Sequence, residues 1–250
     1  MIISVVNHSS KTDGEVREAI RAVNRQIERD FEPHWDLGAS VHLAATASRI
    51  RATGRDRVAV VHLRKSWNED EHLPTPVGAA TGWVFTAIGP ETEATVPWLH
   101  WTVALSHEIL ELVADPDLNT LIKGPHPAAK REVFHYREVC DPVQANMYQI
   151  DGVLLSNFVL PHYYNGEGEA GGDNDFLGWR SKRLGRTAPK LPALKAFRWR
   201  HHGEIGFWDP TLHRTNRYVT FPLSDPDDPP DKARKVKGET GRLRRYARPR

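Results

Sequence analysis

The chain has 250 residues and a mass of 28.3 kDa, which suits one domain or one domain with two lobes. Hydrophobic residues make up 39% of it, which excludes global disorder. No apolar run reaches the roughly 18–20 residues of a membrane helix, which excludes an integral membrane protein. The net charge is +2, and the one cysteine, Cys140, allows no internal disulfide. The first residues lack a signal-peptide pattern, so we expect a cytoplasmic or virion-associated protein.

Residues 1–95 alternate between strand and helix patterns. Apolar residues recur at three- and four-residue steps from Asp13 to Glu32, which predicts a helix with Thr12 or Asp13 as its N-cap and Pro33 at its end. β-rich segments predict strands at residues 2–7, 39–46, 57–65 and 78–88. Glycines at the start of the last segment suit an edge strand that another backbone can approach. We expect an α/β (α+β) fold with a mixed sheet, whose last strand is antiparallel to its neighbour.

The helix predicted over residues 96–114 carries the candidate chemistry. Apolar residues surround it on all sides, which indicates a buried helix, yet it contains His107, Glu108 and Glu111. Buried carboxylates need a partner, and a bound cation is the simplest one. His107 and Glu111 are four residues apart, so both can bind one metal ion, while Glu108 flanks the ion as a general base for metal-bound water. The alternative interpretation is a set of charges on a helix surface.

A third metal ligand has to come from elsewhere, because Asp115-Pro116 ends this helix. In the segment 137–142 we expect Asp141 first and Glu138 second, with the other one orienting His107. The alternative role for both carboxylates is a helix cap or an ion pair with Arg137. Weaker ligand candidates are His135, Asp115 and Cys140, although a buried structural thiol is the preferred interpretation of the cysteine.

The C-terminal part divides into a second lobe and a tail. Residues 116–223 are less regular, with a hairpin predicted around Asp151-Gly152, and we expect this lobe to supply the third ligand to the lobe formed by residues 1–115. Residues 224–231 hold three prolines and four aspartates, and residues 232–250 hold nine basic residues and one acidic residue. We expect 224–250 to be extended, and the part beyond Pro230 to make few contacts with its own domain unless a partner orders it. The basic tail, 232–250, is either a solvated extension or a contact for an acidic partner.

The His-Glu-x-x-Glu motif, preceded by this order of strands and helix, resembles the zincin metallopeptidases. The longer pattern SHEILELVADPD, EVCDPV and YQIDGVLLSNFVLP is similar to uncharacterised bacterial and phage proteins of zincin type, over residues 1–165. The resemblance implies a zinc ion, an edge strand that pairs with the peptide substrate, and a second lobe that supplies the third ligand. Glu111 stands where most zincins have histidine, so the oxygen-rich ligand set also suits other divalent cations.

Three functions follow from these patterns. The first is a zinc-dependent hydrolase, most simply a metallopeptidase acting on a peptide or protein. The second is a non-catalytic protein of a virion or larger assembly in which the ion holds two lobes together. Glu108 distinguishes this function from the first, because a structural metal site has no use for a general base. The third is a nucleic-acid-associated protein that acts through its basic tail. Candidate groups for stabilising an oxyanion, with core packing as the alternative role, are His162, Tyr163 and Tyr164.

Overall fold

The computed structural model combines helices with one parallel and two antiparallel sheets, so the predicted α+β class is confirmed. None of the helices in the described residues is long and apolar enough to cross a membrane. The description covers residues 1–46, 57–65, 79–86, 100–117, 119–126, 129–144, 146–165, 175–178, 196–198, 203–220 and 234–235.

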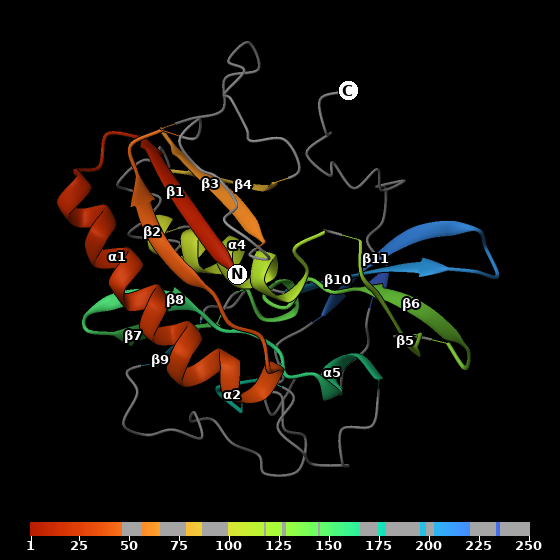
Figure 1. The fold of residues 1–250 in the computed structure, drawn as a ribbon. Coiled ribbons are helices and arrows are strands. Elements are labelled where there is room, and N and C mark those ends of the chain that lie inside the picture. Colours follow the sequence, from red (N-terminus) through yellow and green to blue (C-terminus); the bar gives the residue numbers. More distant parts are fainter. Residues whose placement is uncertain are drawn as a thin grey trace.

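The N-terminal strands form a parallel sheet of four described strands in the order β2-β1-β3-β4 (Figure 1). Their bounds are Ile2–His8 for β1, Ser40–Ala44 for β2, Val58–Arg64 for β3 and Ala80–Phe85 for β4. The predicted antiparallel direction of the last strand is wrong, because β4 pairs with β3 in parallel. Residues 65–79 separate the two strands, and a parallel crossover needs about a dozen residues, whereas an antiparallel pair can be joined by a tight turn. Parallel and antiparallel pairing therefore occur in separate sheets.

The first helix, α1 (Asp13–Gln26), begins as predicted, and the helical path that it starts ends later than predicted. Thr12 is the N-cap and forms a capping box with Glu15. The helical path continues through a π-helical turn, Ile27–Phe31, into α2 (Glu32–Trp35). Pro33 does not end it, because it lies in the first turn of α2, where the missing N–H has no helical partner to lose. The chain leaves the helix at Asp36, which is left-handed at φ 53°.

Helix α4 (Trp101–Ala114) lies between the parallel sheet and a hairpin from the second half of the chain. It packs against β4 on one side and against β8 (Val153–Ser156) on the other, which explains why apolar residues surround it. His100 is its N-cap, so the helix begins later than position 96, and residues 96–99 lie outside the described part. The prediction of a buried motif helix is confirmed for residues 101–114.

The predicted second lobe contains more regular strands than its sequence suggested. One antiparallel sheet has the order β12-β11-β10-β6-β5 and the other has the order β8-β7-β9. The remaining bounds are Leu121–Pro125 for β5, Glu132–Tyr136 for β6, Asn146–Ile150 for β7, Ala196–Arg198 for β9, Gly203–Asp209 for β10, Arg214–Thr220 for β11, Arg234–Lys235 for β12 and His162–Asn165 for α5. The predicted hairpin is present between β7 and β8, with positive φ at Asp151 and Gly152.

One hydrophobic core joins residues from both predicted lobes. Val61 of β3, Ile20 of α1, Leu105 of α4 and Tyr148 of β7 belong to the same cluster. The division at residue 115 is still a prediction, and the packing is continuous across it. In the tail, Arg234 and Lys235 pair with β11, so these two residues do contact their own domain. Residues 236–250 lie outside the described part.

Candidate metal centre

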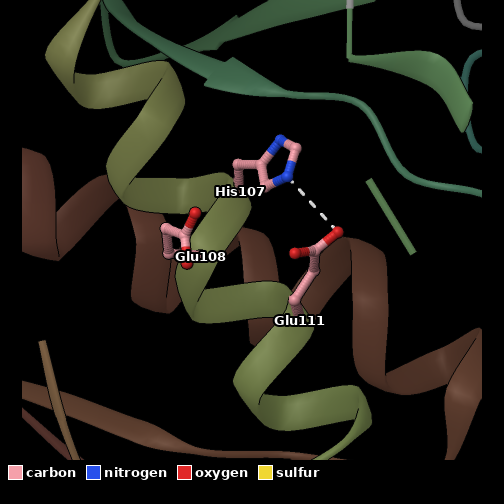
Figure 2. Close-up of side chains that lie close together, drawn as sticks. All are labelled: His107, Glu108 and Glu111. Atoms are coloured by element: carbon pink, nitrogen blue, oxygen red, sulfur yellow. Dashed lines mark ion pairs between the residues drawn. The ribbon is translucent and has the colours of Figure 1, made fainter. Parts of the chain in front are cut away.

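Helix α4 places three ionisable side chains together on a helix whose other residues, apart from Thr102 and Ser106, are apolar. Ligand atoms of His107, Glu108 and Glu111 all lie within 4.8 Å of one another. Figure 2 shows His107 and Glu111 pointing toward each other across one helical turn, with Glu108 on the flank. The spacing of four residues between His107 and Glu111 produces this arrangement directly.

Asp141 joins this group from a different element. It begins the 3₁₀ turn Asp141–Val143, between β6 and β7. His107 Nε2 lies 3.3 Å from Glu111 Oε1 and 3.3 Å from Asp141 Oδ1. The side chains of His107, Glu111 and Asp141 are 16%, 15% and 18% exposed, so the group is recessed but open to solvent.

Backbone and core contacts hold the two elements in place. The Cys140 N–H donates to Glu111 Oε1 at 3.2 Å, which links the loop after β6 to the helix. On the helix, Ser106 Oγ accepts from the Ser156 N–H at 2.7 Å and Thr102 Oγ1 donates to the Leu154 carbonyl at 2.7 Å. These contacts fix α4 to β8. Sequence reasoning missed Ser106 and Thr102, although hydroxyl residues on a buried helix are a signal of such contacts.

Charges within the group perturb its pKa values. Burial raises the pKa of Glu108 to about 8, with the His107 charge lowering it and the Glu111 and Asp141 charges raising it further. Burial lowers the pKa of His107, but the Glu111 charge and hydrogen bonds with Asp141 and Glu111 outweigh this, so the pKa stays well above 6.5. Burial also raises the pKa of the Cys140 thiol, and the residue belongs to the hydrophobic core, as expected for a buried structural thiol.

The other ligand candidates face elsewhere. Glu138 points toward β10, where its Oε2 lies 3.3 Å from the position that a Cβ on Gly206 would occupy. His135 Nε2 lies 2.9 Å from the Pro125 carbonyl oxygen. The Asp115 carboxylate accepts from the Thr120 N–H and hydroxyl, which fixes the turn after α4. The structure therefore brings Asp141 to His107, engages His135 and Asp115 with other groups, and places Glu138 Oε2 beside β10.

The candidate oxyanion residues occupy three different environments. His162 is exposed at the start of α5, and Tyr163 is half-buried against Tyr164. Tyr164 is buried, and its hydroxyl donates to the Glu138 carbonyl at 2.7 Å. Burial raises the pKa of Tyr164, and the charges of Tyr163, Glu111, Glu138 and Asp141 raise it further, which places its ring close to the acidic group. Its hydroxyl is engaged in holding the loop that carries Asp141.

Gly82 of β4 allows the parallel sheet to approach the flank of α4 that carries Glu108. A Cβ at this position would lie 3.3 Å from Leu112 Cδ1 and 3.7 Å from Glu108 Cβ. β4 is also the last strand on its side of the parallel sheet in the described residues. The glycine expected for an edge strand thus serves close packing between strand and helix.

Comparisons with known proteins gave no match to a family model, to a curated protein or to a solved structure.

Proposed function

We propose that this protein is a metal-dependent hydrolase, most simply a zinc metallopeptidase acting on a peptide or protein. The observation that carries the proposal is the pair of 3.3 Å separations from His107 Nε2 to Glu111 Oε1 and to Asp141 Oδ1. Zinc ligands about 2.0–2.2 Å from the ion in a tetrahedral arrangement lie about 3.3–3.5 Å apart.

The composition of the group also suits a divalent cation. Two carboxylates and a neutral imidazole neutralise a 2+ ion, which offsets the cost of keeping Glu111 and Asp141 side by side in a recessed place. His107 has to lose its proton to become a ligand, and its raised pKa means that metal binding releases this proton. When bound, the ion would polarise a substrate carbonyl and acidify a water molecule.

Glu108 is the residue that supports a catalytic role. Its carboxylate lies on the flank of the group, within 4.8 Å of the ligand atoms of His107 and Glu111, a spacing that leaves room for one water between them. Its pKa of about 8 is high for a carboxylate, and a nearby cation would bring it down toward neutrality, where a general base is effective. A purely structural site gains nothing from a buried carboxylate at this position.

The alternative is a structural metal site in a virion protein or larger assembly. The observation in its favour is that His107 and Glu111 come from α4 while Asp141 comes from the loop after β6, so an ion would tie distant segments of the chain together. The two functions differ in what Glu108 does. In the structural alternative the ion stabilises the fold and Glu108 can be replaced without consequence for any reaction.

Elemental analysis of the purified protein and of single variants tests the metal site. We expect about one zinc or other divalent ion per chain, lost in His107→Ala, Glu111→Ala and Asp141→Asn. Glu138→Gln is the matched control, because it removes a carboxylate three residues from Asp141 that faces β10. Full metal content in both His107→Ala and Glu111→Ala would refute the site, and loss in Glu138→Gln alone would reassign the third ligand.

Hydrolysis of a peptide library tests the catalytic role. Glu108→Gln keeps the shape of the side chain but cannot accept a proton, so it should retain the metal and lose about 10²–10⁴-fold in rate. A chelator should abolish activity, and added zinc should restore it. If the parent protein is inert on every peptide and its Glu108→Gln variant behaves identically, the structural alternative stands.

A further inference from the structure

The loop that presents Asp141 to His107 has no regular structure of its own. Residues 137–140 lie between β6, which ends at Tyr136, and the 3₁₀ turn that begins at Asp141. Groups behind the ligands of a metal site fix where the ligands stand. The contacts that hold this loop therefore decide whether Asp141 Oδ1 stays 3.3 Å from His107 Nε2.

Two neighbouring carbonyl groups of this loop accept hydrogen bonds from the segment that follows β8. The Val159 N–H donates to the Val139 carbonyl at 2.8 Å, and the Tyr164 hydroxyl donates to the Glu138 carbonyl at 2.7 Å. Both donor residues are buried. The carbonyls lie two and three residues before Asp141, so the position of this carboxylate depends on the segment that carries the two donors.

Trp35, in α2, contacts both of these donor residues. Its Nε1–H donates to the Val159 carbonyl at 3.0 Å, and its ring meets the Tyr164 ring edge-on, with the centroids 6.5 Å apart. On another side the Trp35 ring stacks on Phe31 at 5.8 Å, with 10° between the planes. Stacking on a fully buried ring limits the orientations that the indole can take. One side chain thus bears on both supports of the loop.

The end of the first helical segment fixes the place of Trp35 in the backbone. The π-helical turn Ile27–Phe31 precedes α2, and such turns recur at functional sites. Asp36 follows Trp35 in the left-handed conformation, at φ 53°, and its N–H donates to the Glu32 carbonyl at 2.9 Å. This arrangement ends the helix directly after Trp35.

We propose that Trp35 is a positioning residue for the metal centre, which acts through Val159 and Tyr164 to keep Asp141 within reach of the ion. This inference rests on the proposed function, because it takes Asp141 as a metal ligand. If Trp35 served core packing alone, it would stabilise the metal-free and the metal-bound protein equally. Because coupling between two sites is reciprocal, metal binding should in turn hold Trp35 in place.

Competition with a chromophoric chelator measures the zinc affinity of Trp35→Phe, which removes the indole N–H and keeps an aromatic ring beside Phe31. The affinity should fall about 2–10-fold, the range that the loss of one hydrogen bond produces. Ile20→Ala is the matched control, because it opens a cavity in the same core from α1. Both variants should have lower melting temperatures, but only Trp35→Phe should reduce the increase in melting temperature that zinc produces.

Hydrogen exchange in the metal-free protein tests the same contacts without zinc. In Trp35→Phe the Val159 amide should exchange about 2–10-fold faster relative to the amides of β1, whereas Ile20→Ala should leave this ratio unchanged. Added zinc should slow exchange of the Trp35 indole N–H in the parent protein. That signal is identified by its absence from the NMR spectrum of Trp35→Phe.

Three results would each overturn the role of Trp35. They are an unchanged exchange ratio in Trp35→Phe, a zinc affinity equal to that of the parent, and an equal loss of affinity in Ile20→Ala. A parent protein that binds no zinc or other divalent ion would refute the proposed function instead, and the exchange ratio would then decide by itself whether Trp35 holds the loop.

Discussion

Replacement of Gly124 by alanine should destabilise the protein severely and loosen the metal centre. A Cβ on Gly124 in β5 would lie 1.9 Å from the Tyr164 carbonyl oxygen and 3.0 Å from His135 Cδ2. Even close C–H···O contacts in proteins keep about 3.3–3.6 Å between carbon and oxygen. The backbone of Gly124 or of Tyr164 therefore has to move by about 1.4 Å to reach the shortest of these distances. The group that has to move is a main-chain carbonyl, which a rotamer change cannot relieve.

We expect a loss of about 3 kcal/mol in the free energy of unfolding, the upper end of the usual range for overpacking. For a chain of this size that corresponds to a melting temperature lower by about 6–12 °C. Displacement of Tyr164 also disturbs its bond to the Glu138 carbonyl, and with it the loop that carries Asp141. Metal affinity should therefore fall together with stability, although Gly124 touches no ligand.

Urea unfolding, with and without chelator, measures both effects. Gly14→Ala is the control, because the nearest atom to a Cβ there is Thr12 Oγ1 at 3.7 Å, an ordinary contact in the first turn of α1. That substitution should leave stability unchanged or raise it by about 0.4–1 kcal/mol. A Gly124→Ala protein that unfolds like the parent and binds metal equally well would refute the packing argument.

Three further outcomes follow. Tyr164→Phe removes a buried hydrogen bond of 2.7 Å and should cost about 1 kcal/mol in unfolding while weakening metal binding, as measured by competition with a chelator. In the metal-free protein, Glu108→Gln should raise the melting temperature above pH 4.5, because a carboxyl whose pKa rises from 4.5 to about 8 lowers stability progressively between those pH values and fully above pH 8; a lower melting temperature would contradict this. Burial lowers the pKa of His62 and of His135 from 6.5 to about 4. As the pH falls, the unfolded chain therefore takes up protons on these rings before the folded chain does. The contribution of the two neutral rings to the free energy of unfolding is complete above pH 6.5 and is lost as the pH falls toward 4. Proton NMR should find both rings neutral at pH 5, and titration near pH 6.5 would exclude their burial.

The sequence alone was sufficient for features that depend on neighbouring residues. The N-cap at Thr12, one of the two positions expected, the turn at Asp151-Gly152 and the buried character of α4 each arise from residues a few positions apart. The shared helix face of His107 and Glu111 is of the same kind, because four residues span about one turn. These expectations needed no knowledge of how distant segments meet.

Only the tertiary structure decided which distant groups come together. Asp141 and Glu138 are three residues apart and chemically alike, and the packing of the loop after β6 turns one toward His107 and the other toward β10. The direction of β4 likewise depends on the path of its connection, and the stacking of His8, His62 and Trp83 from three neighbouring strands depends on strand order. Pairing between strands is a long-range choice, which local patterns in the sequence constrain but do not determine.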